Sequence, residues 1–442
     1  MNYLVNNLKQ VLTAVVLLLG GLLGPAPVMA VINVQIQTDQ GDIDIELFNE
    51  EAPLTVKNFL NYYCDGDYKG TFIHRSAPNF VVQMGGFIFE PNNGDFFGAG
   101  TSHIPTDPPV VNEPDPVNRS NIRGTIAMAK LGGNADSATS EWFVNLVDNS
   151  ANLDNQNGGF TVFGRVTGNG MNTVDAIAAL PRCEDIKPGT CGSFDTTPLV
   201  NFVLGDMVQP ANLVKLDHNN DDADGDGICD VIEDGALNAG DGNNDNMPDR
   251  GQGHVASFTD NNGTYLSLVT DPALLFGSIS VSGSEFLIFR PAINEMAGNN
   301  FSYGFIGFEI SNAAPGASIQ ADLILPPGVS PVNYFKYGGT PGNPLPHWYE
   351  FGFDGETGAE FRGNTITLNY VDGKRGDSDL DGTNGVIVDP GAPALRAGIV
   401  GPSGSSGGCS LRSNVTASSQ AGAWWLILLM GVVFAGWRSC RQ

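Results

Sequence analysis

The chain has 442 residues, too many for one ordinary hydrophobic core, so we expect two or three domains. Its 21 Lys and Arg residues stand against 48 Asp and Glu residues, a formal net charge of -27. This acidity excludes nucleic acid and anionic lipid as partners of the soluble part, because phosphate binding needs an excess of cationic side chains. It favours cations as ligands.

The first thirty residues have the pattern of a secretory signal peptide. Lys9 precedes an apolar run at 11–23, and a Val-Met-Ala sequence ends at Ala30. We therefore assign residues 1–30 to a signal peptide and expect a mature, exported chain that begins near Val31. An uncleaved membrane anchor is the alternative, although the run is short for a span.

The next elements follow from local patterns. Alternating apolar and polar residues at 31–46, with a Gly-Asp turn, predict a first hairpin. Residues 52–62 predict a helix, because Pro53 suits a first helical turn and the apolar residues recur at helical spacing. Residues 171–180 predict a second short helix, and 200–208 a closing strand.

Two separated regions carry the strongest functional signal. Residues 72–87 read FIHRSAPNFVVQMGGF, which places Arg75 ahead of an apolar stretch. A planar, permanently charged guanidinium beside an apolar pocket suits chemistry in which one substrate atom is touched and the rest is buried. Later runs read GTIAMAK at 124–130, SEWFVN at 140–145, NLD at 152–154 and FTVFGR at 160–165. Together these runs resemble the cyclophilins, the prolyl cis/trans isomerase family, over about residues 32–208.

The resemblance implies a mainly β fold for a domain at 31–209, a closed eight-stranded barrel capped by two helices. It implies isomerisation of X-Pro bonds with no cofactor for catalysis. Arg75 would donate a hydrogen bond to the proline nitrogen of the twisted amide, and Gln83 would bind the substrate backbone beside it. The substrate-binding positions implied are Phe80, Val81, Ala129, Lys130, Glu141, Phe143, Leu153 and Phe160.

The chain departs from the usual family pattern at some of these positions. Val81 stands where a methionine is usual, which should adjust the pocket mildly. Glu141 stands where a glutamine is common, and a carboxylate there could pair with Arg75 and either orient it or blunt it. We predict that Glu141→Gln changes the catalytic efficiency several-fold. We interpret His74 as structural.

The six cysteines, at 64, 183, 191, 229, 409 and 440, show no Cys-x-x-Cys spacing. In an oxidising compartment Cys183 and Cys191, which bracket a short loop, could form a disulfide. A zinc site is the alternative, but no histidine or second cysteine pair lies nearby. Cys64 and Cys229 have no obvious mates and are expected to be free.

Residues 216–253 are rich in Asp, Asn and Gly and offer little to a core. From Asp222 onward, oxygen-bearing residues follow the register of an EF-hand loop, and a poorer copy with Gln252 at the last position starts at Asp241. We predict that structural Ca²⁺ orders this linker, because clustered carboxylates repel one another without a hard cation. A solvated acidic linker is the alternative. The predicted metal ligands are Asp222, Asp224, Asp226, Ile228, Asp230, Glu233, Asp241, Asn243, Asp245 and Asp249.

Residues 255–395 contain several short alternating stretches, rich in aromatic residues and separated by Gly, Pro and Asn. This pattern predicts a second domain, an antiparallel β-sandwich. The stretch resembles the choice-of-anchor domains found beside C-terminal surface anchors of bacterial exported proteins.

The C-terminal residues have the pattern of an anchor. A Gly/Ser-rich linker at 396–420 precedes an uncharged apolar run at 421–437, followed by Arg438 and Arg441. This run predicts a transmembrane helix or sorting segment whose basic end stays cytoplasmic. Either the tail is processed near Cys409 or it remains as a plain anchor.

These patterns together predict an isomerase of the cell envelope or cell surface, membrane-anchored unless its tail is processed, that acts on proline-containing polypeptides and assists their folding. The alternative is a catalytically weak proline-peptide binding or adhesion module. A third interpretation gives the working part to the sandwich, with a glycan or protein ligand. The sequence makes no prediction of oligomeric state.

Overall fold

A computed structural model describes residues 30–93, 96, 100–186, 191–204, 206–282, 296 and 298–396. The chain divides into two units, 1–399 and 400–442. The predicted signal peptide up to residue 29, the linker from 397 and the predicted span at 421–437 lie outside the described residues. Within the described ranges, no helix combines the length and the hydropathy needed to cross a bilayer.

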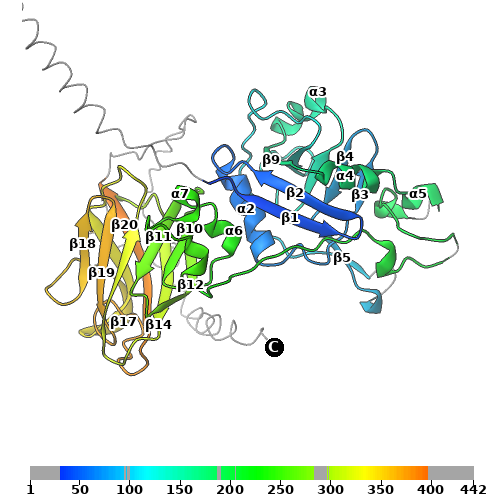
Figure 1. The fold of residues 1–442 in the computed structure, drawn as a ribbon. Coiled ribbons are helices and arrows are strands. Elements are labelled where there is room, and N and C mark those ends of the chain that lie inside the picture. Colours follow the sequence, from blue (N-terminus) through cyan, green and yellow to red (C-terminus); the bar gives the residue numbers. More distant parts are fainter. Residues whose placement is uncertain are drawn as a thin grey trace, which may run out of the picture. The chain divides into compact units, whose positions relative to one another are not determined.

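The N-terminal part of the first unit is built on a seven-stranded antiparallel sheet (Figure 1). Its strand order is β1-β2-β9-β7-β8-β4-β3. The strands are β1 (Asn33–Thr38), β2 (Gly41–Leu47), β3 (Arg75–Ala77), β4 (Val81–Met84), β7 (Thr125–Met128), β8 (Trp142–Asn145) and β9 (Val162–Val166). A separate pair consists of β5 (Phe87–Phe89) and β6 (Thr101–His103). The predicted first hairpin is confirmed as β1 and β2.

The predicted closed eight-stranded barrel is wrong in detail, because the eighth element is not a regular strand. The seven-stranded sheet curls, and the segment 213–217 contacts both of its ends. Gln37 of β1 exchanges backbone hydrogen bonds of 2.7 and 2.9 Å with Asp217. Near β3, the N–H of Ile73 donates to the carbonyl oxygen of Val214 at 2.9 Å. Isolated bridges therefore close the sheet.

The predicted closing strand at 200–208 is also wrong. The described residues of that stretch form no strand, and the closing contacts come from the segment that follows it. The contacts that close the curled sheet therefore come from residues beyond 209, the predicted end of this domain. The alternation of apolar and polar residues pointed to 200–208 instead of 213–217, because the few residues that form the bridges are too short a stretch to show an alternating pattern.

The two predicted helices are present as α2 (Pro53–Cys64) and α4 (Gly170–Ala178). Pro53 occupies the first turn of α2, where a missing N–H costs nothing. The carboxylate of Glu113 accepts hydrogen bonds from the backbone N–H groups of Leu54 at 3.3 Å and Thr55 at 2.7 Å. A carboxylate at this end satisfies free donors and complements the helix dipole.

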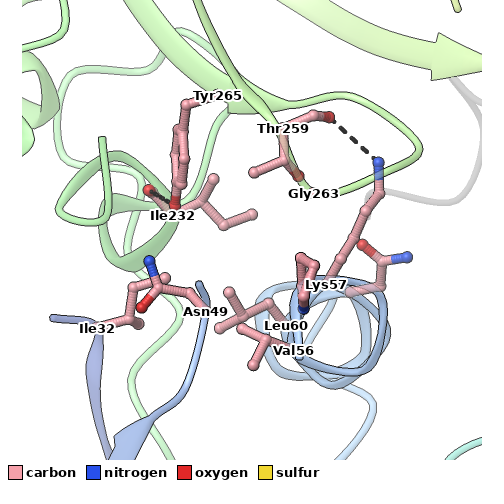
Figure 2. A pocket seen from close by; sticks show the side chains of 11 residues that line it. Ile32, Asn49, Val56, Lys57, Leu60, Ile232, Thr259, Gly263 and Tyr265 are labelled. Atoms are coloured by element: carbon pink, nitrogen blue, oxygen red, sulfur yellow. Dashed lines mark hydrogen bonds between the residues drawn. The ribbon is translucent and has the colours of Figure 1, made fainter. Parts of the chain in front are cut away.

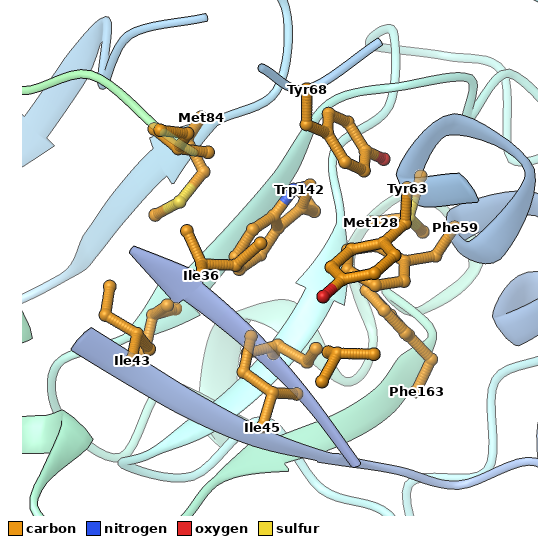
Figure 3. Packing of buried hydrophobic residues seen from close by; sticks show 14 of the residues in the cluster. Ile36, Ile43, Ile45, Phe59, Tyr63, Tyr68, Met84, Met128, Trp142 and Phe163 are labelled. Atoms are coloured by element: carbon orange, nitrogen blue, oxygen red, sulfur yellow. The ribbon is translucent and has the colours of Figure 1, made fainter. Parts of the chain in front are cut away.

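The core of this domain lies between the curled sheet and α2. Strand alternation turns Ile36, Ile43 and Ile45 inward, and all three side chains are buried (Figure 3). Phe59 of α2 packs edge-on against Trp142 of β8, with 5.6 Å between ring centroids. These contacts fix the strands whose opposite faces carry the candidate site.

The remaining helices are short. The α-helical turns are α3 (Ser150–Leu153), α5 (Cys183–Ile186), α6 (Asp230–Glu233) and α7 (Leu237–Gly240). The 3₁₀ turns are η1 (Pro91–Asn93), η2 (Gln156–Gly158), η3 (Gly192–Phe194), η4 (Pro210–Asn212) and η5 (Asp249–Gly251).

Two disulfides are present among the described residues. The predicted Cys183–Cys191 bridge is confirmed. The expectation that Cys64 and Cys229 are free is wrong, because they form a second bridge across 165 positions of sequence. The end of α2 and the turn before α6 meet there, and the side-chain amide of Asn220 also donates to the carbonyl oxygen of Cys64 at 2.8 Å. No local feature of the sequence indicates this pairing.

The described residues from 255 onward form two further antiparallel sheets. One has the order β10-β11-β15-β19-β18, and the other β12-β14-β20-β16-β17 with β13 paired to β20. Both sheets contribute to one buried apolar cluster, as expected of a β-sandwich. The strands are β10 (Val255–Thr259), β11 (Tyr265–Thr270), β12 (Leu275–Ser282), β13 (Asn299–Asn300), β14 (Phe305–Ser311), β15 (Ser318–Ile324), β16 (Asn333–Thr340), β17 (Asn343–Glu350), β18 (Gly358–Arg362), β19 (Thr365–Val371) and β20 (Ile387–Arg396).

Helix α2 also contacts the β10–β11 turn within the first unit (Figure 2). The ammonium group of Lys57 donates to the carbonyl oxygens of Thr259 at 3.1 Å and Asp260 at 2.7 Å. Burial lowers the pKa of Lys57 to about 8. Beside this contact the hydroxyl of Tyr265 donates to the carbonyl oxygen of Ile232 at 2.7 Å, at the edge of a cavity of about 20 Å³. The cavity is too small for a ligand larger than water.

Candidate active site

A row of side chains crosses the curled sheet on the face away from the core. Arg75 lies opposite Gln83 in the β3–β4 pair, and Gln83 lies opposite Phe143 in the β4–β8 pair. Phe143 in turn lies opposite Ala127 of β7. Because side chains alternate along each strand, the neighbours of these residues enter the core while the row itself faces outward. Strand register alone therefore brings together residues that are far apart in the sequence.

Three residues of this row, Arg75, Gln83 and Phe143, line a groove of about 340 Å³. An apolar cluster that includes Val81, Phe143 and Leu153 forms its floor. Two polar residues that the sequence analysis did not assign, Asn152 and Gln156, also line it. The other lining residues are Phe80, Ala129, Lys130 and Phe160. An apolar floor with a few converging polar groups is typical of a ligand site.

Arg75 lies half-buried at the end of the groove. One of its terminal N–H groups, Nη1, donates to Oε1 of Gln83 at 3.1 Å. Its guanidinium carbon lies 5.6 Å from the centroid of the Phe80 ring. Burial lowers the pKa of Arg75 from its ordinary value, yet a guanidinium remains charged in proteins. The side chain is thus a fixed cationic donor beside an apolar surface.

Glu141 lies behind Gln83 rather than in the groove lining. Its Oε2 lies 3.2 Å from Nε2 of His74, and its Oε1 lies 3.1 Å from Nε2 of His103. Burial by itself would raise the pKa of Glu141, but hydrogen bonds and charge from His74, with further hydrogen bonds from Gln83 and His103, lower it to about 2. The carboxylate is therefore ionised at neutral pH.

The predicted direct pairing of Glu141 with Arg75 is wrong. Among the described contacts, Glu141 reaches Arg75 only through Gln83, whose Nε2 donates to Glu141 Oε2 at 2.7 Å. A carboxylate accepts only, so the Gln83 amide must turn its NH₂ group to Glu141 and its oxygen to Arg75. Glu141 is accordingly a positioning residue. It also packs on Gly86, where an added Cβ would lie 2.7 Å from the Glu141 side chain.

Polar contacts hold the rim of the groove. The Asp154 carboxylate accepts hydrogen bonds from the backbone N–H of Asn121 at 2.8 Å and from the hydroxyl of Ser120 at 2.5 Å. The Lys130 ammonium donates to the carbonyl oxygen of Gly159 at 2.6 Å and lies 4.7 Å from the centroid of the Phe160 ring. No role was predicted for Asp154, the last residue of the NLD run, or for Asn121, which lies 33 positions earlier in the sequence and gives no local signal.

The predicted peptide-pairing segment at Ala129 is partly engaged within the chain. The backbone N–H of Ala129 donates to the carbonyl oxygen of Glu141 at 2.8 Å. Strand addition at this position would therefore use its carbonyl oxygen and not its N–H.

Comparison with known proteins agrees with this geometry. The model of the family described as cyclophilin type peptidyl-prolyl cis-trans isomerase/CLD matches residues 33–193. A peptidyl-prolyl cis-trans isomerase from Acinetobacter baylyi is 42% identical over 171 residues, which cover 38% of this chain and 84% of that protein. The chain belongs to the cyclophilin-type isomerase family.

Two further relatives extend the match to nearly whole proteins. Peptidyl-prolyl cis-trans isomerase A from Dickeya dadantii is 39% identical over 212 residues, covering 47% of this chain and 98% of the relative. Peptidyl-prolyl cis-trans isomerase B from Escherichia coli is 39% identical over 175 residues, covering 39% of this chain and 95% of the relative. The cyclophilin-type domain therefore accounts for less than half of the chain.

Outside the cyclophilin-type domain, the carboxylates of the first Asp-rich loop lie close together and accept hydrogen bonds from the loop's own backbone. Ligand atoms of Asp222, Asp224 and Asp226 lie within 4.8 Å of one another. Asp222 accepts hydrogen bonds from the N–H groups of Gly225 at 2.9 Å and Gly227 at 3.1 Å. The side chains thus converge in the predicted register.

The second loop has the same organisation. The carboxylate of Asp241 accepts hydrogen bonds from the backbone N–H groups of Asp245 at 2.9 Å and Asn246 at 2.8 Å. The side-chain oxygen of Asn243 accepts from the same Asp245 N–H at 3.0 Å. Asp249 accepts from the N–H of Gly242 at 2.8 Å.

The two loops meet at their buried ends. Asp226, Glu233 and Asp249 are fully buried, and each has one carboxylate oxygen without a hydrogen-bond partner in the described part of the chain. The buried Oε1 of Gln252 is likewise unpartnered there. Burial, with repulsion between the carboxylates, raises the pKa of Asp226 to about 8 and that of Glu233 to about 10.

Two other predicted ligands have partners inside the first loop. One oxygen of Asp230 accepts a hydrogen bond from the N–H of Ala223 at 2.8 Å, and the N–H of Ile228 donates to Asp226 at 2.7 Å. Gln252, which looked like a defect at the last position of the second loop, contributes an oxygen at its buried end. The ligand spacing within one loop does not reveal this role of Gln252, because the role depends on contact between the two loops.

Proposed function

We propose that this chain isomerises X-Pro bonds of exported proteins and so assists their folding at the cell envelope. Rotation about such a bond faces a barrier of roughly 20 kcal/mol and takes tens of seconds or more without a catalyst. The observation that carries the proposal is the half-buried Arg75 guanidinium, held by Gln83 at the end of an apolar groove.

The chemistry needs no nucleophile and no bond to the substrate. As the amide twists, the proline nitrogen regains its lone pair, so a donor aimed at it binds the transition state more strongly than either planar form. Arg75 has five N–H donors, and its hydrogen bond to Gln83 uses the Nη1 group. Phe80, Phe143 and Leu153 would bury the proline ring beside that donor. Gln83 keeps the guanidinium in place during the rotation.

The test is Arg75→Ala in the whole chain, measured as kcat/KM on a proline peptide. Loss of one preorganised donor should lower kcat/KM by about 10²–10³-fold. Arg165→Ala is the matched control, because Arg165 is an exposed arginine that pairs with Glu46 on the same sheet and does not line the groove. Equal activity of Arg75→Ala and the control would refute the assignment.

A proline-peptide binding or adhesion module is the second candidate, and Glu141 is the observation that favours it. If the carboxylate blunts Arg75, the wild-type chain binds proline peptides but barely accelerates isomerisation, and Glu141→Gln raises kcat/KM. If Glu141 positions Gln83, the same substitution lowers it. The direction of the change distinguishes the two functions.

Export and anchoring rest on separate features. Two disulfides support a compartment outside the reducing cytosol. The apolar run at 421–437, followed by arginines, supports a membrane anchor or sorting segment. Mass spectrometry of the protein from fractionated cells tests both ends: we expect a mature N-terminus near Val31 and a tail that is either intact in the membrane fraction or cleaved near Cys409. A cytosolic chain that retains residue 1 would contradict export.

We further propose that Ca²⁺ binds the Asp-rich loops and makes them a defined spacer. The support is the set of buried, unpartnered oxygens on Asp226, Glu233, Asp249 and Gln252, since Ca²⁺ takes six to eight oxygen ligands. Added Ca²⁺ should raise the melting temperature, and Glu233→Gln should reduce that rise. Asp39→Asn, an exposed carboxylate of the first hairpin turn, should leave it unchanged. A melting temperature insensitive to Ca²⁺ and to EDTA would contradict the proposal.

A further inference from the structure

A lysine and an aspartate meet in the core of the β-sandwich. Lys336 lies on β16 and Asp389 on β20, two neighbouring antiparallel strands. Both side chains are 0% exposed, and Nζ of Lys336 lies 2.8 Å from Oδ1 of Asp389. Apart from each other, these two atoms have no hydrogen-bond partner in the described part of the chain. Lysine is almost never buried so completely, so the pair calls for a physical reason.

Aromatic side chains enclose the pair. The Lys336 ammonium nitrogen lies 5.2 Å from the ring centroid of Phe351 and 4.9 Å from that of Tyr370. The Tyr370 hydroxyl donates to Oδ2 of Asp389, and the Tyr334 hydroxyl lies 3.5 Å from the same oxygen. The two tyrosine hydroxyls contact Oδ2 of Asp389, so Oδ1 faces the lysine. The aromatic cage therefore excludes water and fixes the direction from which the Lys336 nitrogen approaches the Asp389 carboxyl group.

An ordinary ion pair is energetically unfavourable in such a cage. Removing two charges from water costs several kcal/mol for each ion, and the attraction between them often fails to offset that cost. Burial lowers the pKa of Lys336 and raises that of Asp389, so the surroundings favour transfer of the ammonium proton to the carboxylate. The products are a neutral amine, which is a nucleophile, and a carboxylic acid, which has a leaving group.

We propose that Lys336 and Asp389 are joined by an intramolecular isopeptide bond that forms in the folded chain. The amine nitrogen attacks the carboxyl carbon, a nitrogen–carbon bond forms, and the carbon–hydroxyl bond breaks. One amine hydrogen leaves with the hydroxyl as water, and the other stays on the new amide. The step is a condensation without oxidant, reductant or cofactor. In solution this condensation is slow, partly because the amine and the acid must first meet in the right orientation. The fold already holds the two groups in contact, which removes that requirement.

The position of the bond suggests its use. Strand β20 pairs with β14 and β16, and it ends at Arg396, just before the linker and the predicted anchor. A covalent tie between β16 and β20 would hold the last strand of the domain even if its hydrogen bonds to neighbouring strands were broken. A domain pulled or digested from its C-terminal end would then resist unravelling.

Peptide mass spectrometry of the whole wild-type chain, reduced, alkylated and digested with trypsin, tests the proposal. Trypsin cleaves after Lys and Arg but not before Pro, so a free Lys336 gives separate peptides 251–336, 337–362 and 376–396. An isopeptide blocks cleavage at Lys336 and gives 251–362 joined to 376–396, lighter than the two chains by one water. Separate peptides with no branched species would overturn the proposal.

Controls within the same digest make the result specific. Lys374 pairs with Glu356 in an exposed ion pair, so cleavage after Lys374 should remain complete. Asp389 precedes Pro390, which has no N–H, so loss of water there cannot come from a succinimide. Lys336→Arg and Asp389→Ala must each remove the branched peptide. A branched species that survives either substitution would place the bond elsewhere and refute the assignment.

Discussion

Replacing Glu141 by Gln removes a charge from the support of Arg75 while nearly preserving shape. The pKa of Glu141 falls from its ordinary 4.5 to about 2, which corresponds to about 3 kcal/mol of stability. Because the folded pKa is depressed, this contribution is present above about pH 4.5 and is lost as the pH falls toward 2. The isosteric amide cannot titrate and has no such dependence.

The assay is urea unfolding of a 31–218 fragment and of its Glu141→Gln variant, between pH 6 and pH 2. We expect the wild type to lose about 3 kcal/mol more than the variant over this range, within a factor of two. Glu46→Gln is the control, because Glu46 forms an ion pair with the exposed Arg165 on the same sheet, and exposed pairs contribute little. Parallel curves for the wild type and Glu141→Gln would refute the coupling to His74 and His103.

The same variant should lower kcat/KM several-fold at pH 7, because an amide at this position no longer forces the Gln83 oxygen toward Arg75. The ionised form of Glu141 does not change between pH 5 and 8, so its own titration should not alter the rate in that range. An unchanged kcat/KM would contradict the positioning role, and an increased kcat/KM would also favour the binding-module alternative.

Three other predictions follow from packing and charge. Phe59→Ala should destabilise the cyclophilin-type domain by about 3–5 kcal/mol, measured by urea unfolding, because it removes a fully buried ring; a loss below about 1 kcal/mol would contradict the core assignment. A fragment 31–209 should unfold at lower urea than 31–218, because it lacks the residues that bridge the sheet ends; equal midpoints would refute this closure. In EDTA, the melting temperature should fall as the pH rises from about 4 to 8, because the raised pKa of Asp226 and Glu233 makes ionisation unfavourable in the folded state. Saturating Ca²⁺ should remove that dependence, and a flat profile in EDTA would contradict it.

Sequence alone was sufficient for several local signals, although the alternation at 200–208 was misleading. The run around Arg75, the helix beginning at Pro53 and the register of the Asp222 loop are each read within about a dozen positions. The Cys183–Cys191 bridge closes a loop of 8 positions, which a chain reaches by local turning. Spacing, turn chemistry and helical periodicity act over this range, so their consequences are visible in order along the chain.

Tertiary structure decided which distant groups meet. Glu141 pairs with His74 and His103 instead of Arg75, and Cys64 reaches Cys229 across 165 positions. The meeting of the two acidic loops depends on how the chain packs between its sheets, and that of Lys336 with Asp389 depends on strand order and register. A one-residue change of register would turn Lys336 or Asp389 to the other face of its sheet, and nothing in the local sequence states which strand will be the neighbour. Burial then sets the charge of those groups, because desolvation acts only after the chain has packed around them.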